Sequence, residues 1–289
     1  MTDISGVAPY RLTSTGKLDS AALSDGNPDV ILLGRGNFTD GSNTPASIYA
    51  GTSWAMGSNG GGSNSVVSGA LQMNYPSMIA GSSGGIYNSL HFDPQIGLNE
   101  LYIKFDAKMP NVKHGCKFCK IFGYQNGGNY ANTTFALDYT GTDNGGMRYI
   151  AFGDGTTTAN DTAQVLHLNG ANPSWIGRSY GNGAAVTTAG QSFDSSDWGT
   201  GWHTFRLHIK FNSGTTALNE VNDGEISVNI DGVDYVRATG IFNRHYSNGS
   251  IKYIAFGDHT QSPAASPVSA FDINYDNIFI SRHGFYEGV

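Results

Sequence analysis

Residues 202–211 read W-H-T-F-R-L-H-I-K-F, and this stretch decides the fold class. Every second residue in it is apolar, namely Phe205, Leu207, Ile209 and Phe211. A period of two over this length predicts a β-strand with one buried and one solvent-facing side. The tract 225–231 alternates in the same way, and Asp231-Gly232 is a dipeptide that joins antiparallel strands. Residues 198–236 therefore predict antiparallel strands turned back on each other.

Strand signals continue along the rest of the chain. Further strands are predicted at 30–33, 70–75, 101–108, 117–123, 134–139, 147–152, 251–256 and 272–281. Glycine accounts for 40 of the 289 residues, and only four of the 23 acidic residues are glutamate, which favours helices where aspartate favours turns. Residues 57–69, G-S-N-G-G-G-S-N-S-V-V-S-G, are predicted to form a flexible or functional loop. The expected fold is all-β with negligible helix.

The predicted domain organisation is simple. Residues 1–29 are polar and interrupted by Pro9, Gly16, Gly26 and Pro28, so an extended N-terminal arm is expected there. Residues 30–289 are expected to form a single β-sandwich domain, because no break in composition divides them.

Charge and hydropathy exclude several classes of partner. The net charge of −7 and the pI near 5.5 argue against nucleic-acid binding, which needs a basic surface. No run of about 18 apolar residues exists, so no membrane span is predicted. The first ten residues, M-T-D-I-S-G-V-A-P-Y, lack the basic and apolar regions of a secretion signal, so none is predicted.

One short sequence occurs twice. R-Y-I-A-F-G-D-G-T at 148–156 is echoed by K-Y-I-A-F-G-D-H-T at 252–260, although the flanking residues do not repeat. Two strands in equivalent positions of facing sheets would explain the echo, and coincidence is the alternative.

The ordered series of strand motifs resembles a known fold family. It comprises N-F-T-D-G (37–41), L-N-E-L-Y-I-K-F-D-A-K (98–108), K-F-C-K-I-F-G (117–123), W-H-T-F-R-L-H-I-K-F-N (202–212), D-G-E-I-S-V-N-I-D-G (223–232) and Y-D-N-I-F-I-S (275–281). The series is similar to concanavalin A-like lectin/glucanase jelly-roll domains, and closest to the branch of polysaccharide lyases and laminin-G-like modules. The resemblance implies two large antiparallel sheets packed face to face, one of them concave.

The resemblance also suggests which chemistry to look for. The glucanase branch carries two glutamates flanking an aspartate on one strand, and no such pattern occurs here. The lyase branch carries a lysine segment, which H-G-C-K-F-C-K resembles with His114, Lys117 and Lys120. Arg148 and Tyr149 lie on a plausible neighbouring strand, although the Y-x-Y pair of the lyases is missing. If the chain is a lyase, the expected catalytic residues are His114, Lys117, Arg148 and Tyr149; the alternative is that these are ordinary solvated strand residues.

The two cysteines and the clustered aspartates point less clearly to a site. Cys116 and Cys119 form C-K-F-C with no second pair, so neither a zinc site nor a thioredoxin-like motif is predicted, and two buried or half-buried thiols are expected. Calcium is the candidate cofactor, because it accompanies folds of this kind and takes clustered oxygen ligands. Its candidate ligands are Asp138, Asp143 and Asp223, and plain turns are the alternative.

Two surfaces are expected to suit glycan binding. One is the polar side of the predicted strands, with Tyr102, Lys104, Arg206 and His208. The other is the long segment 169–197, whose candidate contacts are Trp175, Arg178 and Tyr180. A buried tryptophan that anchors this segment is the alternative.

The leading hypothesis from sequence is a non-catalytic surface β-sandwich, such as a decoration protein or tail adhesin of a phage or virus particle. It predicts a location on the virion surface or outside the cell. The expected partners are other subunits of the assembly, including copies of the chain, with glycan as a candidate ligand and neither nucleic acid nor membrane. The alternative is a polysaccharide lyase that cleaves an anionic, uronate-containing glycan by β-elimination.

Overall fold

A computed structural model describes most of the predicted sandwich. The described residues are 11–12, 18–19, 31–48, 52–79, 86–94, 98–109, 114–125, 131–141, 147–151, 164–167, 185–188, 200–213, 221, 223–241, 248–259 and 269–286. Within them every regular element is a β-strand, as the alternating sequence predicts. No helix in this part of the chain has the length and apolar character needed to cross a membrane.

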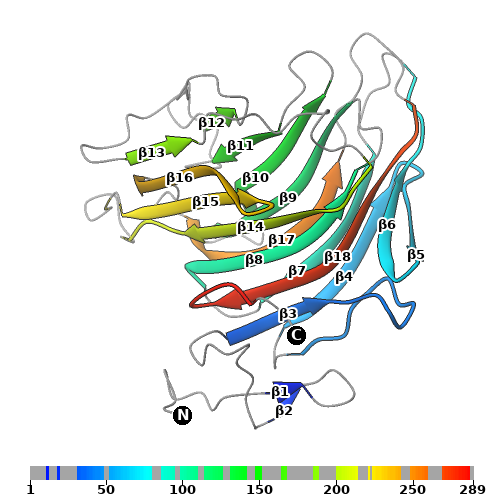
Figure 1. Ribbon diagram of the computed structural model, residues 1–289, viewed down its shortest axis with the longest axis horizontal. Helices are drawn as coiled ribbons and strands as arrows, with labels where there is room; N and C mark the ends of the chain where they lie inside the picture. The colour runs from blue at the N-terminus through cyan, green and yellow to red at the C-terminus, as the bar shows by residue number, and fades with distance from the viewer. Residues whose placement is uncertain are drawn as a thin grey trace.

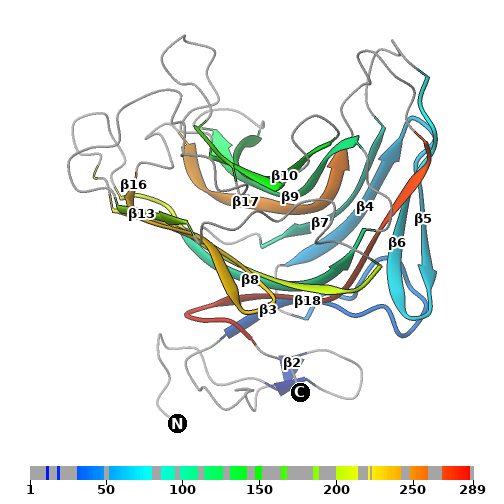
Figure 2. The same cartoon turned by 45° about the horizontal axis from the view of Figure 1, so that its top comes forward.

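The first large sheet has seven antiparallel strands and is strongly bent. Its order is β12 (Gln164–His167), β11 (Met147–Ala151), β10 (Ala131–Gly141), β9 (His114–Gln125), β17 (Asn248–His259), β7 (Tyr87–Asp93) and β4 (Ser53–Asn59). Figure 2 shows that its hollow side faces away from the second sheet. This hollow side is called the concave face below.

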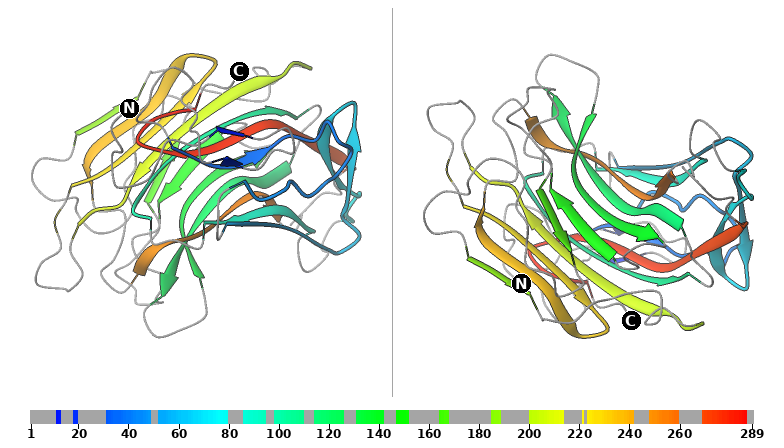
Figure 3. Two further views of the ribbon diagram at one scale, coloured as in Figure 1. Left: turned by 90° about the horizontal axis from the view of Figure 1, so that it is seen from below. Right: turned by 90° about the horizontal axis from the view of Figure 1, so that it is seen from above.

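The second large sheet packs against the first; its strands are labelled in Figure 1, and Figure 2 shows it beneath the first sheet. Its order is β13 (Ala185–Thr188), β16 (Val233–Ile241), β15 (Gly224–Ile230), β14 (His203–Lys210), β8 (Glu100–Lys108), β18 (Phe271–Arg282), β6 (Ala70–Tyr75) and β5 (Ser63–Val67), and β3 (Ile31–Gly36) completes the nine by pairing with β18. Figure 3 shows the molecule from the side of the nine-stranded sheet (left) and from the side of the seven-stranded sheet (right).

The hydrophobic core lies between the two sheets. Strand β8 shows how the sequence builds it, because Leu101, Ile103 and Phe105 are fully buried while the residues between them are half-exposed. Phe105 lies at the centre of an aromatic cluster whose other members are Phe118, Phe205, Phe256 and Tyr275. The cluster draws its rings from both sheets, and burial of such large apolar groups is the main force that holds the layers together.

Two buried tyrosine hydroxyls also connect the sheets. Tyr275 on β18 donates to the carbonyl of Phe118 on β9 at 2.8 Å and accepts from the backbone N–H of Gly257 on β17 at 3.0 Å. Tyr75 on β6 donates to the carbonyl of Asn88 on β7 at 2.9 Å. Strand pairing cannot join two stacked sheets, so these side chains supply polar contacts across the core.

The central hairpin predicted from sequence is confirmed. Strands β14 and β15 pair with Leu207 opposite Val228, and β15 returns into β16 through Asp231-Gly232. Both turn residues have positive φ, 52° for Asp231 and 85° for Gly232, which is the backbone conformation that a tight two-residue hairpin needs.

Two expectations were wrong. Residues 57–69 are not one long loop, because β4 runs to Asn59, β5 begins at Ser63, and Gly60 and Gly61 turn the chain with positive φ. Val66 packs against the core, which explains why a segment rich in glycine, serine and asparagine forms a strand. The echoed segments do not lie in facing sheets either: β11 and β17 belong to the same seven-stranded sheet, separated by β10 and β9.

The expected N-terminal arm remains largely untested. Within residues 1–29 the structure describes only a short two-stranded pairing of β1 (Arg11–Leu12) with β2 (Leu18–Asp19). The arm therefore stays a prediction.

Candidate functional site on the concave face

The middle strands of the seven-stranded sheet carry polar and aromatic side chains on the face opposite the core. On β7, Leu90 and Phe92 point into the core, so the alternation of a strand sends Ser89 and His91 to the concave face. The neighbouring strands β17 and β9 contribute Tyr253, Phe122 and Lys120 to the same region.

These five side chains form one chain of contacts across three adjacent strands. The ammonium of Lys120 lies 5.3 Å from the ring centre of Phe122, which stacks on Tyr253 at 4.2 Å between centroids. The ring of Tyr253 is tilted against that of His91 at 5.0 Å. Finally, Nε2 of His91 lies 2.7 Å from Oγ of Ser89. This set, Lys120, Phe122, Tyr253, His91 and Ser89, is called the concave-face cluster below.

Small residues flank the histidine and the serine. In the strand register His91 lies opposite Ala255 on one side and Ala55 on the other. Ser89 lies opposite Gly257 and Gly57 in the same two strands. Because the neighbours are so small, the imidazole is not enclosed by large side chains of its own row.

Lys120 differs from the other charged residues in its burial. Its side chain is 6% exposed, and it is the only buried charged residue among those whose burial the structure describes. Lysine is almost never fully buried in proteins, because removing an ammonium from water is costly. A cation held in such a place acts through a low dielectric and attracts an anion more strongly than a solvated one would.

The seryl hydroxyl gives the histidine a defined orientation. Ser89 is fully buried, and its hydroxyl lies within hydrogen-bond distance of Nε2 of His91, two residues further along the same strand. The hydroxyl can donate to Nε2 or accept from Nε2–H, and either bond holds the ring in place. The imidazole can therefore serve in proton transfer with a fixed geometry.

The structure brings two of the four lyase residues expected from sequence into one row of strand positions. The register places Lys117 opposite Asp138, and Asp138 opposite Arg148, so these backbone positions form one row across β9, β10 and β11. His167 on β12 continues the row opposite Arg148. Here the structure describes the backbone alone, and the roles expected for Lys117 and Arg148 stay predictions.

The other two expected lyase residues lie apart from this row. Tyr149 is opposite Leu137, which in turn is opposite Cys119, and His114 is opposite Gly141 at the start of β9. Their side chains are not described either, so their roles also stay predictions.

Sequence reasoning missed Ser89, His91 and Tyr253. The echo could have found Tyr253, because it occupies the position of Tyr149 in the repeated segment.

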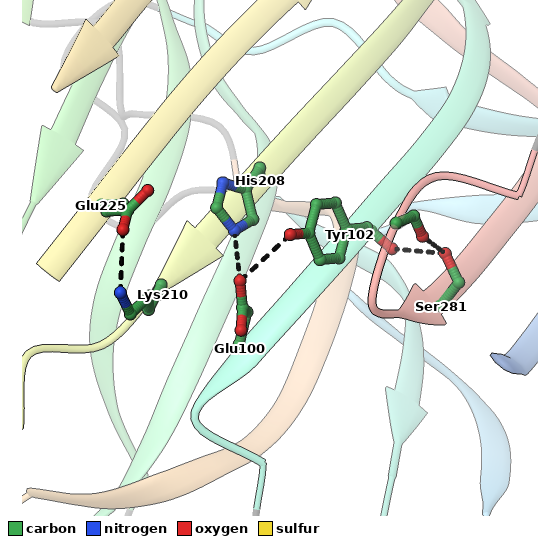
Figure 4. A network of polar contacts seen from close by, with 7 residues as sticks. Glu100, Tyr102, His208, Lys210, Glu225 and Ser281 are labelled. Carbon is green, nitrogen blue, oxygen red and sulfur yellow. Dashed lines mark hydrogen bonds and ion pairs between the residues drawn. The ribbon is translucent and has the colours of Figure 1, made fainter. Parts of the chain in front are cut away.

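The expected glycan-binding residues on strands β8 and β14 lie on the other sheet. Tyr102, Lys104, Arg206 and His208 are all half-buried and face outward from the nine-stranded sheet. The rings of Tyr102 and His208 stack at 4.3 Å, and both side chains contact Oε1 of Glu100, at 3.1 Å and 2.8 Å (Figure 4). Their polar ends therefore engage a neighbour within the sheet. Trp175, Arg178 and Tyr180 lie outside the described residues.

The pKa of Glu100 is lower than the ordinary value of a glutamate. Burial alone would raise this pKa, but the hydrogen bonds from His208 and Tyr102, together with the charges of His208 and Lys210, outweigh it. The same contacts act on Tyr102, whose pKa rises to about 12 because of burial and the adjacent Glu100 charge. Lys210 itself forms an ion pair with Glu225 at 2.8 Å.

The lowered pKa of Glu100 predicts a stability effect that depends on pH. A carboxyl group with a depressed folded-state pKa stabilises the fold above its unfolded pKa, and this contribution is lost as the pH falls through the folded pKa. Glu100→Gln is therefore expected to lower the free energy of unfolding by less than about 1 kcal/mol at pH 7. The difference from the unmodified protein should shrink as the pH falls below the ordinary pKa of glutamate, about 4.3, and vanish below the lowered folded-state pKa. Urea denaturation at pH 7 and pH 3 measures both values, and an undiminished difference at pH 3 contradicts the role of the charge.

The cysteines and the calcium candidates are only partly visible. Cys119 is a buried free thiol, and burial raises its pKa. The side chain of Cys116 is not described.

Asp223 accepts a hydrogen bond from the backbone N–H of Ser213 at 2.5 Å. The described residues contain no group of three or more histidines, cysteines, aspartates or glutamates that could hold a metal ion. Asp143 and the side chain of Asp138 lie outside the described part, so calcium binding stays a prediction.

Comparisons with known proteins place the fold. No family model and no curated protein sequence matches the chain. An endo-β-1,4-glucuronan lyase from the fungus Trichoderma reesei superposes with a TM-score of 0.54 at 11% identity, covering 78% of this chain and 89% of the lyase. The catalytic domain of an endo-1,3-β-glucanase (laminarinase) from Thermotoga petrophila gives a TM-score of 0.51 at 15% identity, covering 88% and 98%.

A third similar structure is the alginate lyase vAL-1 from Chlorella virus, with a TM-score of 0.50 at 14% identity over 80% of this chain and 93% of the lyase. At such low identities these similarities concern the fold alone. The chain has the jelly-roll β-sandwich fold that these polysaccharide lyases share with a glucanase.

Proposed function

We propose that the chain is a polysaccharide lyase that cleaves a uronate-containing glycan by β-elimination on the concave face of the seven-stranded sheet. The observation that carries the proposal is the buried cation Lys120, in contact with an aromatic pair and, through it, with an imidazole. A cation, a phenol and an imidazole on one sheet face are the groups that this elimination needs.

The carboxylate of the sugar determines what the site must do. The proton on C5 is α to the carboxylate, and it becomes acidic when a positive charge stabilises the negative charge that develops there. Lys120 is assigned this role, because a buried ammonium stabilises the developing charge without solvent reorganisation. Lys117 and Arg148, in the row of opposed positions described above, are assigned to the carboxylates of neighbouring sugar units.

Tyr253 and His91 are assigned the proton transfers. One of them takes the C5 proton, the electron pair of the C5–H bond forms the C4=C5 double bond, and the C4–O bond breaks. The departing glycosidic oxygen takes a proton from the other, so protons and electrons balance without water or an oxidant. The two rings lie 5.0 Å apart, which lets both reach adjacent atoms of one sugar. Ser89 orients His91 through the contact with Nε2 and is a positioning residue.

Hydrolysis by two glutamates, as in the glucanase branch, is a poorer match to the described residues, although a glucanase shares the fold. A retaining or inverting hydrolase needs two carboxyl groups that flank the scissile bond. Of the four glutamates, Glu100 and Glu225 lie on the outward face of the nine-stranded sheet, and Glu220 and Glu287 lie outside the described residues.

The non-catalytic virion protein expected first from sequence has no supporting observation. Neither the described residues nor the similar structures indicate a particle, a partner subunit or a location, so that hypothesis and the expected assembly stay predictions. The fold similarity to two lyases favours the alternative hypothesis.

The test is incubation of the protein with alginate, with glucuronan and with the neutral glucan laminarin. Eliminative cleavage conjugates the new double bond with the carboxylate, so near-ultraviolet absorbance is expected to rise with at least one uronate polymer. Laminarin has no carboxylate and should give no such rise. New reducing ends without absorbance would instead indicate hydrolysis, and a uronate panel without turnover under any buffer condition would overturn the proposal.

A further inference from the structure

A small depression lies on the opposite side of the molecule, on the outward face of the nine-stranded sheet. The register places Ser227 on β15 between His208 on β14 and Arg237 on β16. A serine between two long side chains leaves a hollow of about 130 Å³. Its polar lining is His208, Glu225, Ser227, Asp234, Arg237 and Thr239.

The carboxylates of the depression are held in place by neighbours. Glu225 accepts from the ammonium of Lys210 at 2.8 Å, and Asp234 accepts from the amide of Asn229 at 2.7 Å. Each of these bonds uses one oxygen, Oε1 and Oδ1, so the groups are oriented before any ligand arrives. A preoriented acceptor loses less conformational freedom when a ligand binds.

The donors of the depression are not used within the described part of the chain. The side chains of Ser227, Arg237 and Thr239 make no hydrogen bond or ion pair there. A guanidinium offers five N–H donors, and each hydroxyl both donates and accepts. The hollow thus combines fixed acceptors and unused donors, and both kinds of group come from β15 and from β16.

The charges of the depression balance. Arg237 brings one positive charge and Asp234 one negative charge, and the negative charge of Glu225 is paired with Lys210 beside the depression. A charged ligand therefore gains little net Coulomb energy, whereas a ligand with many hydroxyls can use donors and acceptors together. A peptide needs apolar anchors, and the lining is polar. The volume suits a single small ring.

We infer that this depression binds a neutral sugar residue, at a site separate from the concave-face cluster on the other sheet. The inference goes beyond the proposed lyase function and does not depend on it. Among the glycan-binding residues expected from sequence, only His208 lines the depression; Tyr102, Lys104 and Arg206 do not.

The experiment is a titration of the full chain with the methyl glycosides of glucose, galactose, mannose and xylose, and with glucuronate, followed by ligand-observed NMR. Saturable binding in the millimolar range is expected for at least one neutral glycoside, and weaker binding for glucuronate. Arg237→Ala removes the donor and Ser227→Tyr fills the hollow, so each should weaken binding about tenfold or more. Arg282→Ala, which alters an arginine of β18 outside the depression, should leave binding unchanged.

Three outcomes would overturn the inference. The first is an absence of neutral-sugar binding, and the second is tighter binding of glucuronate than of any neutral glycoside. The third is that both pocket variants, with unchanged melting curves, bind the sugar as tightly as the unmodified protein does. The two sites can be separated experimentally, because the pocket variants should keep any turnover of a uronate polymer. Conversely, a failed lyase assay leaves the sugar titration unaffected.

Discussion

Replacing Lys120 by methionine is expected to lower kcat/KM on a uronate polymer by about 10²–10³-fold. Methionine keeps the length and the apolar stem of the side chain but removes the charge, so the packing against Phe122 should survive. The loss follows because no other described charged side chain is buried as Lys120 is. Initial rates from the near-ultraviolet absorbance of the product measure the effect.

The control for this variant is Lys108→Met. Lys108 is half-exposed on the outward side of β8, in the other sheet, and its loss should leave kcat/KM unchanged. Tyr253→Phe provides a second comparison, because it removes only the phenolic hydroxyl and keeps the ring, which stacks on Phe122 and is tilted against His91. Full activity of a folded Lys120→Met protein would contradict the assignment of the concave-face cluster.

Phe105→Ala is expected to lower the free energy of unfolding by about 3–5 kcal/mol. Phe105 is fully buried, stacks on Phe205 at 5.1 Å and meets Phe256 edge-on at 5.4 Å. These rings come from both sheets, so the cavity left by the substitution opens in the middle of the core and cannot close by movement of one strand. Chemical denaturation measures the loss.

The matched control is Arg206→Ala, on the outward face of the adjacent strand β14. Arg206 is half-buried, and substitutions at such surface positions usually change stability by no more than about 0.5 kcal/mol. Comparable effects of Phe105→Ala and Arg206→Ala would show that the inward and outward faces of these strands are assigned wrongly.

The sheets were predictable from sequence because their signal is local. Alternation in 101–108 and 202–211 identifies Phe105 and Leu207 as core residues, and both are fully buried. The positive φ of Asp231 follows from its place before Gly232 in a tight turn. The loop predicted for 57–69 was wrong because the composition of this segment suits a loop, whereas the packing of Val66 depends on strands distant in the sequence.

The concave-face cluster was only partly predictable because it depends on pairing between distant strands. Ser89 and His91 lie on β7, a seven-residue strand whose neighbours, β4 and β17, are known only once the sheet is formed. The sequence segment contains both Lys117 and Lys120, and only Lys117 was among the expected catalytic residues. The register distinguishes them, since an extra residue at Phe118 shifts the pairing of β9 with β10 between the two lysines.

The contact between Tyr275 and Gly257 constrains how the chain can diverge in evolution. Gly257 has a positive φ of 71°, and an added Cβ would lie 2.5 Å from the carbonyl oxygen of Asn88, so other residues are excluded there. It is two positions from Ala255, on the strand that carries Tyr253, and Tyr275 anchors it from the opposite sheet. Among homologues, Tyr275 and Gly257 should therefore be retained or replaced together, although neither belongs to the concave-face cluster.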